Sequence, residues 1–286
     1  MLGIIGGTGL YQIPGLQVEQ ELTLSTPFGH PSGVFIRGRW GKKEILFLSR
    51  HGAGHKLLPH EINYRANIFG LKQLGATALL SVSAVGSLCE EFKPGDFVLP
   101  DQYLDFTKGS RELTFFGKGV AAHVATANPI SKSFQDVIFH TGERIQDFGR
   151  SLHRDGTYAC VEGPRLGTRA ESHMLKNLGA HLVGMTNVPE VFLAREAQLA
   201  YCTLAVVTDY DSWLEDPTQH VDVSQVLALY KESLSAVVRV IEQVIQEFSD
   251  TGIEICPSRK ALQNALLTSP EAISPEWKAI LEILRK

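Results

Sequence analysis

Short apolar runs alternate with amphipathic stretches along most of the chain. The runs are rich in Val, Leu and Ile and end in polar or glycine residues, as buried strands do. They cover residues 3–7, 44–49, 78–87, 96–103, 181–185 and 203–212. Between them, residues 61–75 and 169–179 carry apolar side chains at helical spacing and end in Lys followed by Gly, a helix stop signal. The alternation predicts an α/β fold around one sheet.

The last part of the chain is helical in pattern. Residues 221–248 predict one long amphipathic helix, and residues 275–286 predict another after the turn-like residues 256–260. No internal repeat, low-complexity tract or Pro/Ser-rich linker divides the chain. We therefore predict one domain over residues 1–250, with residues 251–286 as a helical extension packed on it. Surface packing is the simplest role for the extension, and a subunit contact or a lid are the alternatives.

Composition narrows the class of protein. The 286 residues are 44% hydrophobic and 20% charged, as in a globular protein, and carry a formal net charge of −4. That charge argues against nucleic acid or an anionic membrane as the main partner, so any phosphate must be bound by local groups. The four cysteines are widely spaced, which suits reduced thiols better than disulfides or zinc. Because no signal peptide or membrane-length apolar run is found, we expect a cytoplasmic location.

The chain opens on a glycine-rich loop after its first apolar run. Residues 6–9 read Gly-Gly-Thr-Gly, so backbone N–H groups lie unshielded beside the Thr8 hydroxyl. Such a nest binds a small anion. The G-x-G-x-x-G pattern of dinucleotide-binding loops is incomplete, because Gln12 stands where the third glycine belongs. An anion site, a purely structural turn and a dinucleotide site all remain open at this point.

Polar residues also follow the next two apolar runs. Arg50 and His51 directly follow residues 44–49, at the strand end where α/β proteins bind ligands, and the planar fork of Arg50 matches a phosphate bidentately. His51 and His55 add ring donors of the same kind. Ser83 offers a hydroxyl at the end of the following run. A packed core histidine and a structural serine are the ordinary alternatives.

A pair of aspartates ends the last apolar run. In an extended strand Asp209 and Asp211 point to one face, with Thr208 and Tyr210 on the other. Two carboxylates close together are costly unless something donates to them. Exposed strand-end acids and a metal site are the alternatives, but no further ligand follows at suitable spacing. A ligand that carries hydrogen-bond donors is the better hypothesis.

Taken together, these segments resemble the trimeric class of the purine nucleoside phosphorylase superfamily, and most of all its methylthioadenosine phosphorylase branch. The matching segments occur in the family's order and cover nearly all of residues 1–240. They begin at Gly3, Arg50, Ser83, Pro94, Val161, Gly184 and Thr208. Each segment alone is a weak signal, whereas the ordered set is highly specific.

The resemblance implies a fold and a reaction. The fold is a single α/β domain with a central mixed sheet, a distorted barrel, flanked by helices. The reaction splits the N-glycosidic bond of a purine nucleoside with inorganic phosphate, giving the free base and a ribose 1-phosphate. It needs no cofactor, metal or covalent nucleophile, because phosphate is itself a co-substrate. The resemblance also implies a homotrimer or a dimer of trimers.

The resemblance further assigns site residues. Those implied for phosphate are Thr8, Arg50, His51, Ser83, Ala84 and Thr186. Those implied for the nucleoside are Ala84, Leu166, Met185, Thr186, Asp209, Asp211, Val223, Val226 and Leu227, together with His123 from the neighbouring subunit. The three valine and leucine positions on the long helix match an apolar wall around a 5′-methylthio group. The residues expected to act in catalysis are Asp209, Asp211 and His51.

The choice of base depends on Asp209 and Asp211. A carboxylate accepts from the 6-amino group of adenine and, when protonated, donates to N7 as the base leaves. Relatives that act on 6-oxopurines carry asparagine at the first position, so the expected substrate is 5′-methylthioadenosine. Leu166 and Gly167 depart from the adenine branch, which commonly has an aromatic and a hydroxyl residue there. A 6-oxopurine nucleoside or methylthioinosine is therefore the alternative substrate.

Two alternatives belong to other classes of protein. The chain could be a non-catalytic nucleoside-binding protein that has kept the fold, or a nicotinamide-dependent oxidoreductase. Retention of Thr8, Arg50, His51 and both aspartates argues against the first. The incomplete glycine pattern argues against the second.

Overall fold

The fold is organised around β5, a strand of ten residues (Ala78–Ser87) in a computed structural model that describes residues 1–10, 13–145, 149–215, 223–249 and 256–286. β11 (Ala200–Asp209) runs parallel to β5 along one edge. The other edge is shared by two strands. β1 (Leu2–Gly6) pairs in parallel with the first half of β5, and β10 (Leu182–Gly184) pairs antiparallel with its end.

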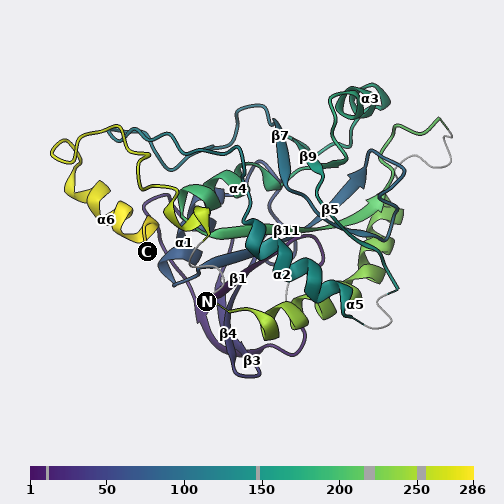
Figure 1. The fold of residues 1–286 in the computed structure, drawn as a ribbon, viewed down its shortest axis with the longest axis horizontal. Helices are drawn as coiled ribbons and strands as arrows, with labels where there is room; N and C mark the ends of the chain where they lie inside the picture. The colour runs from purple at the N-terminus through teal and green to yellow at the C-terminus, as the bar shows by residue number, and fades with distance from the viewer. Residues whose placement is uncertain (11–12, 146–148, 216–222, 250–255) are drawn as a thin grey trace.

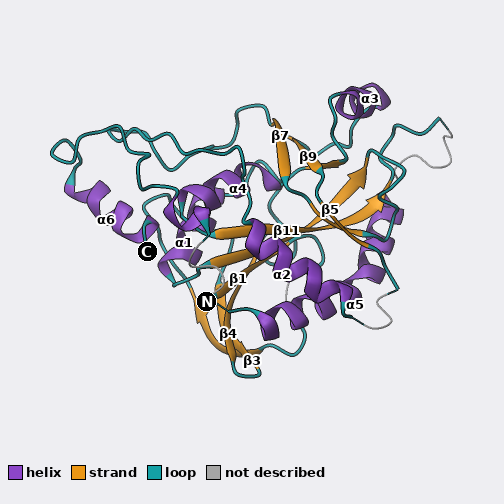
Figure 2. Cartoon of the chain, viewed as in Figure 1, coloured by secondary structure: helices purple, strands orange, loops and turns teal. Residues whose placement is uncertain are grey.

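The remaining strands extend this sheet outward on three sides (Figure 2). They are β2 (Gln17–Leu22), β3 (Phe35–Trp40), β4 (Lys43–Ser49), β6 (Phe97–Leu99), β7 (Gln102–Phe106), β8 (Leu152–Arg154) and β9 (Thr157–Val161). The main path runs β2-β3-β4-β1-β5-β10-β9-β7, while β6 and β8 continue from β11. Within the described ranges this makes an open, branched sheet, so the expected barrel is wrong. The sheet forks because β1 and β10 occupy the same edge of β5, and its outer strands never meet.

Helices cover both faces of the sheet (Figure 1). The described helices are α1 (Tyr64–Gln73), α2 (Lys132–Glu143), α3 (Arg169–Asn177), α4 (Asn187–Glu196), α5 (Val223–Glu247) and α6 (Pro275–Leu284). α1 contacts α4 and α6 on one face, whereas α2 and α5 pack together on the other. α3 stands apart from both groups, near β7 and β9 (Figure 1). No described helix combines the length and hydropathy needed to cross a membrane.

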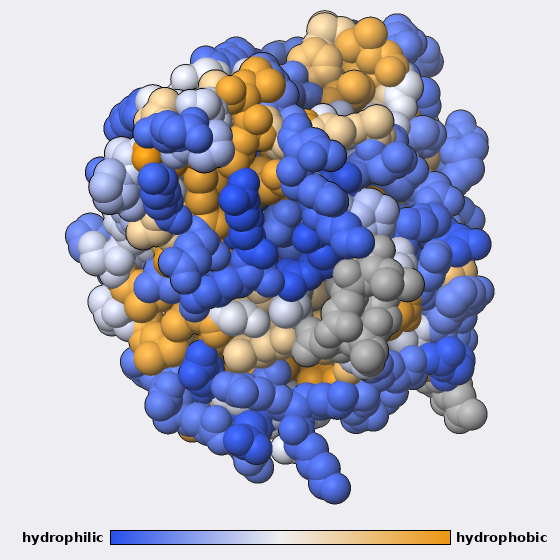
Figure 3. Space-filling model, turned by 60° about the vertical axis from the view of Figure 1, so that its left-hand side comes forward, coloured by the Kyte–Doolittle hydropathy of each residue, from blue (hydrophilic) through white to orange (hydrophobic). Residues whose placement is uncertain are grey.

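Two apolar cores fill the two faces of the sheet. Because side chains alternate along a strand, β5 supplies both of them. Its Leu79 and Val85 belong to the core under α1, α4 and α6, and its Leu80 and Val82 belong to the core under α2 and α5. The face shown in Figure 3 is mostly hydrophilic, with apolar side chains in several separate groups. A strand buried on both faces therefore holds the centre, and this explains its unbroken apolar sequence.

The predicted strands are all present, and the differences lie at their edges. Residues 96–103 form two strands instead of one, because the run is interrupted at Pro100, which has no N–H for a sheet ladder. β2, β3, β8 and β9 were not predicted, and five of the six residues of β2 are exposed, all of them polar except Val18. α2 and α4 were also not predicted. α4 is buried on nearly every side, so it lacks the polar stripe that marks a surface helix.

The C-terminal part of the chain follows its helical pattern. α5 confirms the long helix, although residues 221 and 222 of the predicted range lie outside the described residues. The expected boundary at residues 250 and 251 also lies outside them, so the division into domain and extension stays a prediction. Trp277 and Leu281 of α6 are buried in the same core as α1.

The buried Lys72 of α1 predicts a pH-dependent stability. Its side chain is 1% exposed, and Nζ has no hydrogen-bond partner among the described residues. Burial and the charge of Arg259 lower the pKa of Lys72 from 10.5 to about 7. The folded protein therefore binds fewer protons here than the unfolded chain between pH 7 and 10.5, and this site adds stability as the pH rises through that window.

We expect Lys72→Met to flatten this dependence. Urea unfolding at pH 7 and pH 9.5 should show the wild type gaining free energy of unfolding relative to the variant as the pH rises. Lys132→Met is the matched control, because Lys132 is exposed and pairs with Asp155. Parallel pH curves for the wild type and Lys72→Met would contradict the assignment.

Candidate active site

A cavity of about 290 Å³ opens where several strands of the sheet end. Its walls come from the loops after β1, β4 and β10, from the second half of β5 and from the end of β11. Of the predicted site residues, the cavity is lined by Thr8, Arg50, His51, Ser83, Ala84, Leu166, Met185, Thr186, Asp209, Asp211 and Val226. Residues more than 200 positions apart in the sequence thus face one space.

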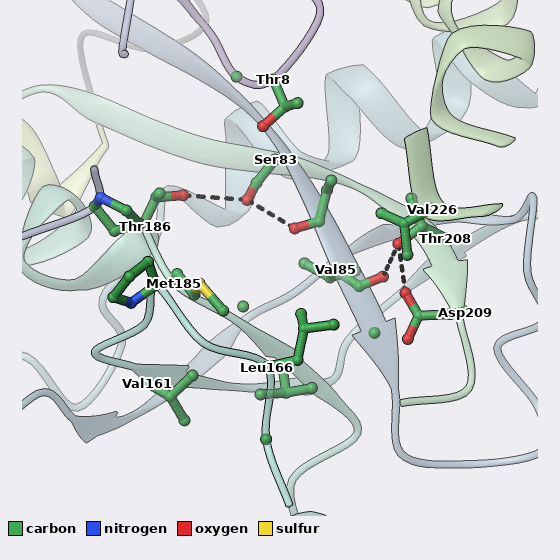
Figure 4. Close-up of a pocket in the computed structure, with 18 of the residues that line it drawn as sticks. Thr8, Ser83, Val85, Val161, Leu166, Met185, Thr186, Thr208, Asp209 and Val226 are labelled. Carbon is green, nitrogen blue, oxygen red and sulfur yellow. Dashed lines mark hydrogen bonds between the residues drawn. The ribbon is translucent and has the colours of Figure 1, made fainter. Parts of the chain in front are cut away.

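Three hydroxyl groups gather at one end of this cavity (Figure 4). Thr8 points toward Ser83, and Ser83 Oγ lies 3.3 Å from Thr186 Oγ1. Asp209 lies at the opposite end, while Met185 lies beside Thr186 and Leu166 lies along the lower side of the cavity (Figure 4). The cavity therefore has a hydroxyl end, suited to an anion, and a carboxyl end, suited to hydrogen-bond donors.

The glycines of the first loop are required by close approach. A Cβ on Gly7 would lie 2.5 Å from the Val82 carbonyl oxygen and 3.1 Å from Arg50 Nη1. Gly9 has a φ of +78°, and a Cβ there would lie 3.2 Å from the Tyr230 ring. No side chain fits at Gly7, so the loop lies directly against β5 and brings Thr8 to the hydroxyl end.

Arg50 forms a buried ion pair with Glu190 of α4. Arg50 Nε lies 2.7 Å from Glu190 Oε2 and Nη2 lies 3.0 Å from Oε1, and both side chains are 1% exposed. Nη2 also donates to Ser81 Oγ, and Nη1 donates to the Val82 carbonyl. Burial alone would lower the pKa of Arg50, but the Glu190 carboxylate outweighs it and raises the pKa.

This pairing corrects the expected geometry of Arg50. The bidentate fork faces Glu190 and not the cavity. Among the described residues, four of the five guanidinium N–H donors of Arg50 have protein partners. One Nη1–H is therefore left for a ligand. Arg50 can give an anion a single hydrogen bond and a permanent positive charge. Glu190 was missed because it lies in the first turn of α4, with no sign in the local sequence of a partner 140 residues away.

His51 is held as a neutral ring. Burial and the charge of Arg50 lower its pKa from 6.5 to about 4. Its Nδ1 lies 2.9 Å from the Leu57 carbonyl, which can only accept, so Nδ1 carries the ring proton. Nε2 is then an acceptor. The neutral His51 ring therefore offers an acceptor to the cavity and not the expected donor, and this acceptor fits the O–H of a hydrogen phosphate.

The carboxyl of Asp209 is half-buried, and among the described residues no cation pairs with it. Thr208 Oγ1 lies 2.7 Å from Asp209 Oδ2, and the Asp211 N–H donates to Oδ1 at 2.7 Å. Burial outweighs these hydrogen bonds and raises the pKa of Asp209 from 3.8 to about 6. A substantial fraction of Asp209 is therefore protonated near pH 6, which suits a group that gives up a proton.

Asp211 is placed by a turn and by a serine of α3. β11 ends at Asp209, and Asp211 has a φ of +49°, so the expected alternation of an extended strand is wrong beyond Asp209. Both carboxyls still line the cavity because the chain turns there. The buried Ser172 hydroxyl donates to Asp211 Oδ2, and burial raises the pKa of Asp211. Ser172 was not singled out from the sequence, although it ends one of the matching segments.

The structure does not bring every expected residue to the cavity. His123 is exposed and outside it, and its backbone N–H donates to Ala265. Leu227 is 49% exposed and does not line the cavity. Val223 begins α5, but its side chain lies outside the described part of the structure. Of the expected apolar wall, Val226 alone has a described side chain lining the cavity.

Comparison with known proteins shows to which family the chain belongs. A model of the phosphorylase superfamily matches residues 1–244. The chain belongs to this superfamily. The S-methyl-5′-thioadenosine phosphorylase of Geobacter sulfurreducens is 42% identical over 284 residues, which are 99% of this chain and 97% of the relative. That of a Synechocystis species is 46% identical, covering 94% of this chain and 82% of the relative.

Solved structures show the same likeness. A methylthioadenosine phosphorylase from an antarctic soil metagenomic library has a TM-score of 0.89 and 42% identity, covering 99% of this chain and 98% of that one. The methylthioadenosine phosphorylase of Schistosoma mansoni in complex with adenine has a TM-score of 0.85 and 33% identity, covering 93% and 98%. The chain thus shares its fold with both structures over nearly its whole length.

The buried ion pair predicts a large loss of stability when its charge balance is broken. Glu190→Gln leaves the Arg50 charge buried without a counter-charge, so we expect the free energy of unfolding to fall by about 3–5 kcal/mol. Denaturant unfolding at pH 7 measures it.

The matched control is Glu196→Gln on the same helix. Glu196 accepts from Thr114 and from the Phe115 N–H, pairs with no cation in the described part of the chain, and has a pKa raised by burial to about 7. Because it is already about half neutral at pH 7, we expect a smaller loss. Equal losses for the two variants would show that charge pairing does not set the cost.

Proposed function

We propose that this protein cleaves 5′-methylthioadenosine with inorganic phosphate, giving adenine and 5-methylthioribose 1-phosphate. The observation that carries the proposal is the two-ended cavity, with hydroxyls and a buried cation at one end and two carboxyls of raised pKa at the other. Relatives named S-methyl-5′-thioadenosine phosphorylase that cover almost the whole chain support the same reaction. Phosphate is the co-substrate, and the reaction needs no organic cofactor.

Phosphate binds at the hydroxyl end. Thr8, Ser83 and Thr186 donate to its oxygens, the backbone of Ala84 lies beside it, and the free Nη1–H of Arg50 adds a charged hydrogen bond. Neutral His51 accepts the remaining O–H of hydrogen phosphate through Nε2. These groups hold the anion beneath C1′, where positive charge develops as the glycosidic bond lengthens.

The carboxyl end recognises the purine base and stabilises the negative charge that develops on it as it leaves. Asp211 accepts from the 6-amino group of adenine, and protonated Asp209 gives its proton to N7 as the C1′–N9 bond breaks. A phosphate oxygen forms the new bond to C1′, and Asp209 regains a proton from solvent after adenine leaves. The proton stabilises the leaving group only as the bond breaks. It therefore lowers the activation barrier and does not simply strengthen binding of the substrate.

The sugar and its 5′ substituent lie between the two ends. Met185 packs under the ribose, and Val226 is part of the apolar wall around the methylthio group. We propose that His123 completes this wall in the cavity of a neighbouring subunit, which makes the protein a trimer. The four free cysteines fit a cytoplasmic location for this trimer.

The base assignment is tested by substrate choice and by Asp209→Asn. With phosphate, the wild type should release adenine from methylthioadenosine faster than from adenosine, and faster than hypoxanthine from methylthioinosine or inosine. Asp209→Asn cannot transfer a proton to N7, so we expect adenine release to fall by at least about 100-fold. Asp105→Asn is the control, since Asp105 is exposed and bonded to Thr107 outside the cavity. Chromatography of the free base measures each rate.

Each other outcome points to a defined error. Faster release of hypoxanthine by the wild type would make this a 6-oxopurine enzyme, with Leu166 and Gly167 as its marks. Unchanged adenine release by Asp209→Asn would overturn the proton transfer. Binding of nucleoside without release of any base would indicate a binding protein.

The shared site is tested by mixing two defective subunits. Asp209→Asn disables its own cavity, whereas His123→Ala removes a group from the neighbour's cavity. Co-expressed chains should form trimers in which some cavities carry both Asp209 and His123, and activity should exceed the sum of the two variants measured separately. Sedimentation checks the assembly. Strictly additive activities in mixed trimers would place His123 outside the neighbour's cavity.

A further inference from the structure

A second cavity of about 200 Å³ lies directly against the carboxyl end of the active-site cavity. The two cavities share Val161, Gly167, Val183 and Asp211 as lining residues. The second cavity continues from there toward α3, the helix that stands apart from the others (Figure 1). Nothing in the proposed cleavage of methylthioadenosine occupies this space.

At Gly167, which lines both cavities, no side chain stands between them. A Cβ at this position would lie 3.8 Å from Ser172 Oγ and 3.9 Å from Asp211 Oδ2, so it would fit without strain and would point at the carboxyl that meets the base. Glycine keeps that volume empty. The boundary therefore lies beside the 6-amino edge of a bound purine, where a substituent on the amino nitrogen would leave the ring.

The second cavity suits an apolar group. Phe106, Met174 and Leu175 line it, and Met174 is 44% exposed, so apolar surface is left without packing. Three charged residues that line it, Arg165, Glu171 and Glu162, are paired within the protein, whereas the exposed Lys108 side chain has no ion pair among the described residues. Arg165 donates twice to Glu171 at 2.7 Å, and Glu162 accepts from the Lys108 N–H and from Arg111. A ligand therefore meets no unpaired charge at Arg165, Glu171 or Glu162.

The size of the second cavity sets the size of the group. A cavity of about 150 Å³ lined by apolar side chains holds a benzene molecule. The second cavity, at about 200 Å³, accommodates a phenyl ring with a methylene link. A single substituent on the amino nitrogen leaves one N–H, so Asp211 keeps a donor to accept from.

We propose that the second cavity binds an apolar substituent on the exocyclic nitrogen of the purine, so that the enzyme also phosphorolyses N6-alkyl and N6-benzyl derivatives of 5′-methylthioadenosine. This inference rests on the proposed function. The bond changes are the same: C1′–N9 breaks, a phosphate oxygen bonds to C1′, and the Asp209 proton goes to N7. The product is the N6-substituted adenine.

The test compares three substrates with phosphate: 5′-methylthioadenosine and its N6-methyl and N6-benzyl derivatives. Met174→Trp fills the second cavity from α3 without touching the active-site cavity. Leu178→Trp is the matched control, because Leu178 is exposed at the end of the same helix and lines neither cavity. Release of each base gives kcat/KM for the wild type and both variants.

We expect the wild type to cleave the N6-benzyl substrate, with kcat/KM within about 100-fold of that for methylthioadenosine. Met174→Trp should lower kcat/KM for the N6-benzyl substrate by at least about tenfold, the scale on which filling a pocket excludes a group. It should leave the unsubstituted and N6-methyl substrates within about twofold, because neither reaches the second cavity. Leu178→Trp should leave all three unchanged.

The outcomes separate this inference from the proposed function. No cleavage of methylthioadenosine itself would contradict the proposed function. Cleavage of methylthioadenosine without cleavage of the N6-benzyl substrate would overturn the second cavity as a binding site. Cleavage of all three substrates with equal effects of Met174→Trp on each would show that the benzyl group lies elsewhere, and would overturn it too.

Discussion

The buried ion pair between Arg50 and Glu190 is the interaction on which the site depends. It joins four elements at the centre of the sheet: Arg50 follows β4, Ser81 lies on β5, Glu190 lies on α4, and Tyr201 of β11 donates to the same carboxylate at 2.9 Å. A buried ion pair is stable only when further hydrogen bonds satisfy its polar atoms, and here the strands and the helix supply all but one Nη1–H of Arg50 with a partner. The hydroxyl end of the cavity is built on this junction, next to a positive charge that no change of pH removes.

The carboxyl end follows the opposite principle. Asp209 is half-buried, its carboxyl accepts from a hydroxyl and a backbone N–H, and no cation in the described part of the chain pairs with it. Burial therefore raises its pKa toward neutrality instead of keeping it ionised. One cavity thus holds a fixed cation at one end and a releasable proton at the other. A reaction that attacks C1′ with an anion while protonating a leaving base requires both conditions at once.

The sequence predicted the central strands and the residues at their ends, because buried strands and ligand-binding loops have strong local patterns. It failed where the decisive contact is distant in sequence. α4 has no polar stripe, since it is buried, and the partner of Arg50 lies on it, 140 residues away. The turn that gives Asp211 a positive φ breaks the strand alternation just past its end. The sheet forks because two strands share one edge of β5, and no local pattern encodes that choice.

The most direct test of the account is to ask which nucleophile reaches C1′. Phosphorus-31 magnetic resonance of a reaction with methylthioadenosine follows the phosphate itself. The account predicts that free phosphate declines while a sugar 1-phosphate ester appears, split by its coupling to H1′, with one ester formed for each adenine released. Adenine released without that ester would mean that water attacks instead, and would contradict the assignment of the hydroxyl end to a reacting phosphate.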